Sequence, residues 1–100
     1  MKIFDNVGKK QGLVANGGTT DDATPTISDS GATPGNRISI FDYGVELGRT
    51  DVKPDGTWVF TPSPSLCDGV HSISVVETEP SGVTSEPSAG YVFAVNTVYG

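Results

Sequence analysis

The 100-residue sequence predicts an all-β fold, a sandwich of about seven short antiparallel strands, and three observations carry that prediction. Valine (12) and isoleucine (5) greatly outnumber leucine (3), and their β-branched side chains fit a pleated sheet but crowd a helix. Glycine (13) and proline (7) divide the chain into short segments. Within those segments apolar and polar residues alternate, which is the period of a half-buried strand.

The length and the cysteine count limit the architecture further. One hundred residues are enough for one core but not for two, so residues 1–100 are expected to form a single domain. Cys67 is the only cysteine, which excludes an intramolecular disulfide and any C-x-x-C metal motif. The sandwich is therefore expected to rely on its core alone.

The N-terminal quarter of the chain has the weakest strand pattern. Glycines interrupt residues 1–24, and we expect at most one short strand there, at 11–15. Residues 1–10 are interpreted as a leading linker. The next strand, Thr26–Ser28, follows Pro25 and places Ile27 inward.

The middle of the chain alternates most clearly. In Arg37–Tyr43 the side chains of Ile38 and Ile40 share one face, as expected of a strand packed on one side. Phe41 breaks that alternation. Val45–Leu47 is expected to form a short return strand.

A β-hairpin is predicted at Pro54–Gly56, because Asp-Gly between alternating apolar segments is a strong turn signal. The hairpin would join a strand at Thr50–Lys53 to one at Thr57–Thr61. Trp58 and Phe60 share the inward phase of the second strand and are expected in the core, while exposed, sugar-stacking aromatics are the alternative.

The C-terminal third holds the longest predicted strand. Val70–Thr78 alternates with Ile73 inward, Leu66 is expected to close one end of the core, and Tyr91–Val95 is the last strand. Residues 96–100 are interpreted as an exit linker. Short strands spaced by about 8–12 residues, without a helix, are typical of an immunoglobulin-like (Ig-like) β-sandwich, here without a disulfide.

The charge excludes several classes of partner. The formal net charge is −6, whereas nucleic acids and anionic membranes are bound by basic patches, so neither is expected as a partner. Cations are the natural small partners of such a chain. No apolar run approaches the roughly 18 residues of a membrane-spanning helix, and residues 1–5 lack the apolar stretch of a signal peptide. The chain is therefore expected to be either cytosolic or a piece of a longer exported protein.

Several motifs resemble those of the bacterial Ig-like repeats of large surface adhesins. In the second half they are Asp55–Pro62 (D-G-T-W-V-F-T-P), the L-x-D-G-x-H sequence that begins at Leu66, and Ser81–Ser88 (S-G-x-x-S-x-P-S). The front half agrees through Asp5–Gly8 and Gly17–Ile27. The resemblance thus covers nearly the whole chain as one repeat unit.

The sequence departs from the family pattern at four positions. Asn96 replaces the aspartate of the closing V-D-T, which removes one charge from the exit of the repeat. Cys67 replaces a typical alanine, and Glu79 and Val83 replace the Asp and Asn of the D-A-A-G-N turn.

The resemblance implies a module of long, exported, repetitive proteins that attach bacteria to cells, surfaces or biofilm matrix. On that basis we expect a structural spacer at the bacterial cell surface, with neighbouring Ig-like repeats as its partners. Two alternatives stay open. One is a module that binds host glycan or protein through the loops around Phe41–Tyr43 and Pro62–Asp68, and the other is an accessory domain of an extracellular enzyme.

The resemblance also implies calcium near the junctions between successive repeats. Calcium takes six to eight oxygen ligands, and the candidate ligands are Asp5, Asp21, Asp22 and Asn96. We expect Asp5 and Asn96 at opposite ends of the sandwich, so that each junction combines ligands from two repeats. The alternative is that Asp21 and Asp22 cap a turn through bonds to the backbone.

No catalytic constellation stands out. His71 is the only histidine, and we expect a partly buried ring bonded to the adjacent turn. A nucleophilic Cys67 would need His71 as its base, so a structural or half-exposed thiol is expected instead. Paired carboxylates for glycoside chemistry need a cleft, which a sandwich of this size rarely has. The chain is therefore not expected to be an enzyme.

Overall fold

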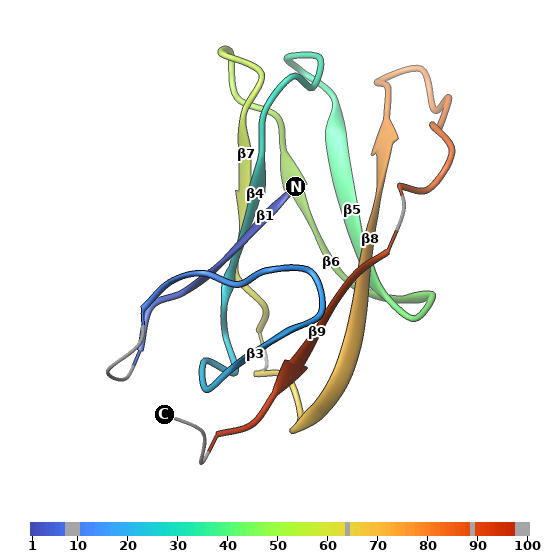
Figure 1. The fold of residues 1–100 in the computed structure, drawn as a ribbon. Helices are drawn as coiled ribbons and strands as arrows, with labels where there is room; N and C mark the ends of the chain where they lie inside the picture. The colour runs from blue at the N-terminus through green and yellow to red at the C-terminus, as the bar shows by residue number, and fades with distance from the viewer. Residues whose placement is uncertain (8–10, 64, 89, 98–100) are drawn as a thin grey trace.

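The computed structural model describes residues 1–7, 11–63, 65–88 and 90–97. In these ranges it contains nine strands and no helix. The strands are β1 (Lys2–Asp5), β2 (Gly12–Leu13), β3 (Gly18–Thr20), β4 (Thr26–Asp29), β5 (Arg37–Asp42), β6 (Val45–Asp51), β7 (Trp58–Phe60), β8 (Gly69–Thr78) and β9 (Tyr91–Val95). They form two facing sheets with the strand orders β2-β1-β4-β7 and β3-β9-β8-β5-β6 (Figure 1). The predicted all-β sandwich is confirmed, although the described residues form nine strands and not about seven.

The core lies between the two sheets and follows the alternation seen in the sequence. Its most deeply buried apolar side chains, none more than 2% exposed, are Ile3, Ile27 and Trp58 from one sheet and Ile38, Ile40, Ile73, Phe93 and Val95 from the other. Leu66 is 8% exposed and closes one end of the core, as predicted. Phe60 is half-buried and packs against the same cluster. Trp58 and Phe60 are therefore core residues, not exposed aromatics.

The N-terminal segment holds more structure than the predicted linker. β1 lies between β2 and β4, and the side chain of Ile3 is fully buried, so both backbone pairing and core packing fix residues 2–5. β3 joins the other sheet, where it pairs in parallel with β9, Gly18 opposite Phe93. The interpretation of residues 1–10 as a linker is therefore wrong for 2–5, and residues 8–10 lie outside the described ranges. The expectation of purely antiparallel pairing is wrong for β3.

The predicted hairpin forms its turn but not its strand pair. The turn closes through bonds from Lys53 N–H to the Thr57 carbonyl (2.8 Å) and from Gly56 N–H to the Lys53 carbonyl (2.9 Å). The chain then passes from β6 in one sheet to β7 in the other, where β7 pairs with β4. Val52, just after β6, is buried and its N–H is bonded to the Asn36 carbonyl, so the chain still lies beside the start of β5 when it enters the turn.

β6 is one continuous strand where two short ones were predicted. It pairs with β5 over its whole length, with a register shift between Ile40 and Phe41. The extra residue of this bulge is Leu47 of β6, because Ile40 lies opposite Gly48 and Phe41 opposite Glu46, and β5 keeps its register with β8 through Phe41.

The two ends of the sandwich are distinct. The exit end, at the bottom of Figure 1, holds the ends of β1, β3 and β9 and the loop that precedes β8. The turn end, at the top, holds the turns at 30–36, 53–57 and 79–82. The predicted turn at 79–82 is confirmed by a bond from Gly82 N–H to the Glu79 carbonyl (2.8 Å).

Candidate functional site

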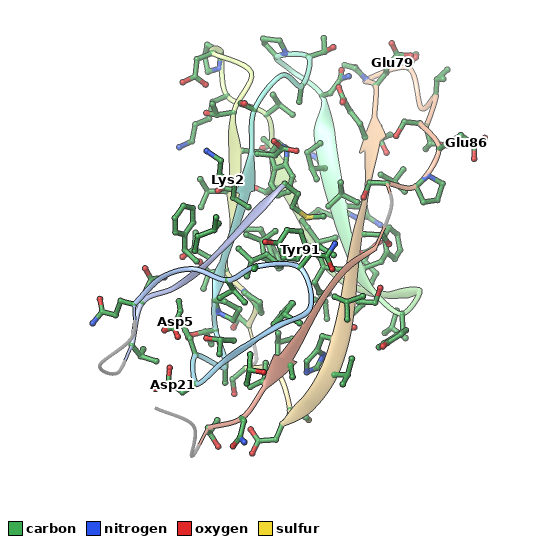
Figure 2. All side chains as sticks on the ribbon, viewed as in Figure 1. Lys2, Asp5, Asp21, Glu79, Glu86 and Tyr91 are labelled. Carbon is green, nitrogen blue, oxygen red and sulfur yellow. The ribbon has the colours of Figure 1, made fainter. Side chains whose placement is uncertain are left out.

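The predicted calcium ligands lie together at the exit end. Asp5 ends β1, Asp21 and Asp22 follow β3, and Asn96 follows β9. Because β3 and β9 are parallel, the residues after them leave the sheet at the same edge. Figure 2 shows Asp5 and Asp21 close together at this end.

Asp5 is buried, and each of its carboxylate oxygens accepts a hydrogen bond from within the chain. It is 7% exposed. Its Oδ2 accepts a hydrogen bond from Thr20 Oγ1 (2.7 Å) and its Oδ1 accepts one from Val7 N–H (2.9 Å). The carboxylate therefore joins the end of β1 to the end of β3.

Asp22 organises the neighbouring turn. It is 2% exposed, and its Oδ2 accepts the N–H of Asn6 (2.9 Å). Its Oδ1 accepts the N–H (2.9 Å) and the hydroxyl (3.2 Å) of Thr24. The alternative reading of Asp22 as a turn cap is therefore confirmed, since the side chain replaces backbone acceptors in two loops.

Asp21 is the carboxyl group whose ionisation is disfavoured at this end. The pKa of its carboxyl lies above the ordinary 3.8, first because of desolvation and then because of a hydrogen bond to Asp5 and repulsion from the charge of Asp5. Repulsion from Asp22 adds a smaller contribution in the same direction. Ionised Asp21 is thus an incompletely compensated negative charge at the exit end, a place where a cation is favoured.

The position of Asn96 shows that the prediction of Asp5 and Asn96 at opposite ends of the sandwich is wrong. The backbone N–H of Asn96 donates to the Thr20 carbonyl (2.9 Å), and Thr20 in turn donates to Asp5. Asp5 and Asn96 therefore lie at the same end of the sandwich, because β1, β3 and β9 all run toward it. Within the described ranges, no three His, Cys, Asp or Glu side chains are arranged to hold a metal ion. Carboxylate and amide oxygens are nevertheless the ligand type that calcium prefers.

The exit segment is anchored by a residue that sequence analysis did not single out. Asp68, in the loop before β8, accepts the N–H (3.2 Å) and the hydroxyl (3.1 Å) of Thr97. The Gly69–Val95 pairing of β8 with β9 brings these two residues together, a long-range register that no local pattern reveals. Residues 98–100 of the predicted exit linker lie outside the described ranges.

A second candidate site is a cavity of about 290 Å³ beside His71. Its walls come from the end of β5 and the start of β6, including Asp42 and Glu46, and from the loop that includes Pro62 and Cys67. These are the two loop regions that the sequence suggested for a glycan or protein ligand.

His71 has both ring nitrogens engaged. It is 8% exposed, and its Nε2 lies 2.7 Å from the Cys67 carbonyl oxygen, the contact to the adjacent turn that the sequence predicted. Its Nδ1 lies 2.5 Å from Asp42 Oδ2, and Asp42 Oδ1 accepts Ser72 N–H (3.0 Å). No ring nitrogen is left to take a proton from the Cys67 thiol. Only the pairing of β5 with β8 reveals Asp42 as a partner, because Asp42 lies opposite Ile73.

No phenylalanine, tyrosine or tryptophan is among the described residues that line this cavity. Tyr43 is 65% exposed and lies in the β5–β6 turn with a positive φ of 47°. Phe41 is half-buried and so differs from the exposed contact residue that the loop hypothesis needs. Cys67 is exposed and has a free thiol.

The comparisons agree with this architecture. No curated protein is significantly similar to the chain. The described residues include no helix long and apolar enough to cross a membrane. The family model of the bacterial Ig-like domain matches residues 3–97, nearly the full length, over the same strands that form the two sheets. With its two-sheet sandwich and the motifs around Trp58 and His71, the chain belongs to the bacterial Ig-like domain family.

Proposed function

We propose that the chain is a non-enzymatic structural repeat of a bacterial cell-surface adhesin, a spacer that holds a distal binding region away from the cell. Members of this family often occur in extracellular or surface proteins. The observation that carries the proposal is the anchored exit: Asn96 is bonded to Thr20, and Thr97 to Asp68. A segment bonded to the body directs the following repeat at one angle, unlike a freely jointed linker.

The shape of the domain supports the same role. Its principal extents are 44 × 26 × 22 Å, so each repeat adds length along its long axis. Tandem copies that bury their own cores add stiffness at their junctions. The partners of this chain are then further Ig-like repeats of the same exported protein.

Calcium at the exit junction is the second part of the proposal. Asp5, Asp21, Asp22 and Asn96 would supply oxygens from this repeat, and the following repeat would supply the rest of the six to eight that calcium takes. The raised pKa of Asp21 supports the idea: desolvation is its largest cause, and a cation would relieve the repulsion from Asp5 and Asp22 that adds to it. The ion would draw the two repeats together and stiffen the junction.

The absence of an enzymatic role is part of the same proposal. His71 is the only histidine of the sequence, and its two nitrogens already face Asp42 and the Cys67 carbonyl. Ligand binding at the 290 Å³ cavity is the second candidate function, because that cavity brings together the two predicted loops and Tyr43 is exposed close by.

Two copies of the domain in tandem test the spacer. Small-angle scattering in calcium should give a maximum dimension close to twice the 44 Å length, and chelator should broaden the distribution of dimensions. At 100-fold saturation calcium should add about 2.7 kcal/mol of stability, on the order of 10 °C in the thermal midpoint. Asp21→Asn should abolish the calcium response, whereas Asp55→Asn at the turn end should keep it.

Each part of the proposal has its own contrary result. A compact, flexible tandem in both conditions would contradict the spacer. A rigid tandem that ignores calcium and chelator would keep the spacer and remove the ion. Specific retention of the single domain on a glycan array, lost in Tyr43→Ser, would favour the binding module.

A further inference from the structure

The hydrogen bonds of His71 require more protons than a neutral histidine and an ionised aspartate hold together. A carbonyl oxygen only accepts, so Nε2 must carry a hydrogen to bond the Cys67 carbonyl at 2.7 Å. A proton must also lie between Nδ1 and Asp42 Oδ2, because two lone pairs 2.5 Å apart would repel. The pair therefore holds two protons and no net charge, whereas neutral histidine with ionised aspartate holds one.

The His71 ring is buried, so the number of protons that the pair holds affects its contacts within the protein. His71 is 8% exposed, and its ring packs against Phe93 with centroids 5.8 Å apart. The second oxygen of Asp42 is already bonded to the N–H of Ser72, so the carboxylate cannot turn away without losing that bond. The two oxygens of Asp42 are therefore bonded to two different groups, the His71 ring and the Ser72 N–H.

The other ionisable groups that face the ring are few. Glu46 of β6 and the Cys67 thiol line the same cavity as His71 and Asp42. Glu46 lies 3.2 Å from the guanidinium of Arg49, which offsets its charge. β9 presents Phe93 to the ring, an uncharged neighbour. The shared proton is thus governed mainly by Asp42.

We propose that His71 and Asp42 form a pH-sensitive switch that controls how firmly the exit segment is held. With the shared proton in place, the ring ties the Cys67 turn to β5 and β8. When the pH rises and that proton leaves, the single remaining hydrogen can satisfy only one of the two oxygens. The turn is then released from β5, or the ring is released from the turn.

The switch reaches the exit segment through one residue. Asp68 follows Cys67 directly and accepts two bonds from Thr97. The Gly69–Val95 pairing holds Asp68 from the side of β8, and the ring contact at Cys67 holds it from the side of the turn, so loss of the ring contact loosens one of the two holds on Asp68 and with it the anchoring of Thr97. Only the consequence for a tandem array rests on the proposed spacer function, since the switch itself belongs to the single domain.

The test is an NMR titration of the 100-residue protein from pH 5 to pH 9. The Cε1–H resonance of His71 and the backbone amide resonances of Asp68, Ser72 and Thr97 should move with one midpoint. Above it, amide exchange of Thr97, corrected for its intrinsic pH dependence, should be at least about tenfold faster, as expected for loss of one charge-assisted hydrogen bond.

Asp42→Asn separates the switch from a general effect of pH. The side-chain N–H of asparagine can donate to Nδ1 of a neutral ring, so both ring contacts form with no extra proton. Thr97 should then stay protected at pH 9. Asp51→Asn is the matched control: it removes the same charge from β6, where the side chain is 82% exposed, and should retain the wild-type response.

Two results would overturn the switch. In the first, the His71 ring titrates while Asp68 and Thr97 do not respond. In the second, Asp42→Asn responds to pH as the wild type does. Both are measured on a single domain without calcium, so either can occur while the tandem scattering still supports the spacer.

Discussion

The two ends of the sandwich are both acidic but are held together by different groups. At the exit end, the buried carboxylates of Asp5 and Asp22 receive donors from separate loops. At the turn end, two turns bond each other directly through backbone groups, as in the 3.0 Å bond from Ala32 N–H to the Gly56 carbonyl, and Glu77 also accepts donors from Thr33 and Asn36. The comparison teaches that a buried aspartate can replace the backbone acceptors that separate loops lack.

The same contrast appears in the ionisation of exposed carboxyls. Desolvation, followed by a hydrogen bond to Asp5 and repulsion from the charge of Asp5, raises the pKa of Asp21 above 3.8 at the exit end. At the turn end, the pKa of Asp55 lies below 3.8, first because its side chain accepts the hydroxyl of Thr57 (2.6 Å) and then because it accepts the N–H of Thr57 (3.0 Å). The exit end therefore disfavours the ionised form of Asp21, whereas the turn end stabilises the ionised form of Asp55.

Asp22→Ala is expected to have the largest effect. It leaves three donors from Asn6 and Thr24 without their acceptor, two of them backbone N–H groups, and should cost about 2–4 kcal/mol. Chemical denaturation measures this loss. Asp55→Ala, which removes the same group from an exposed turn, should cost clearly less. Equal losses would remove the distinction between the two ends.

Gly56→Ala is the corresponding change at the turn end. Gly56 has a φ of 82°, and a Cβ there would lie 2.8 Å from the Ala32 carbonyl oxygen. Left-handed strain and the clash together should cost about 2–4 kcal/mol by denaturation. Gly44→Ala is the control, because Gly44 has a φ of 81° but no atom within 4 Å of the added Cβ. If both variants lose the same stability, the close approach contributes nothing.

Asp68→Ala should change the exit segment and little else. Asp68 is exposed, so global stability should fall by less than about 1 kcal/mol. Amide exchange of Thr97 should nevertheless accelerate, because both of its bonds to Asp68 are lost. Unchanged protection of Thr97 would show that Asp68 does not anchor the exit.

The smallest expected effect is a change in the thermal midpoint that has opposite signs for Asp21→Asn and Asp55→Asn at neutral pH. Because Asp21 has a raised pKa when folded, its contribution to stability falls as the pH rises from 3.8 through that raised value. Asp21→Asn should therefore raise the thermal midpoint slightly at neutral pH without calcium, and this gain should vanish below pH 3.8. The midpoint at several pH values measures it.

Asp55 should behave in the opposite way. Its lowered pKa gives stability that is present above pH 3.8 and lost as the pH falls through the lower folded value. Asp55→Asn should thus lower the midpoint slightly at neutral pH and have little effect in acid. If both variants shift the thermal midpoint at neutral pH in the same direction, the contrast between the two ends is contradicted.

Local patterns predicted most of the core but not how the chain connects it. The phases of Ile27, Ile38, Ile40 and Ile73 are set within single strands, and the sequence shows them directly. The Pro54–Gly56 turn was also predicted, yet a turn reverses the chain without deciding which sheet the next strand joins.

The missed features depend on distant partners. β1 has an Ile3-Phe4 pair that could have indicated a strand, but the bond that makes Asp5 structural comes from Thr20. The contact of Asp42 with His71 spans 29 residues and requires the β5–β8 register. Residues of this kind are found by pairing strands, not by reading one segment.

The parallel pairing of β3 with β9 has a mechanical consequence. A pull on the C-terminus acts along β9, whose neighbours β3 and β8 both lie alongside it with their hydrogen bonds across the direction of force. Such bonds must break together as β9 slides, whereas strands pulled apart from one end break them one at a time. We therefore expect the last strand to resist stretching in shear, so that tension transmitted along the chain is borne by backbone pairing before it reaches the core.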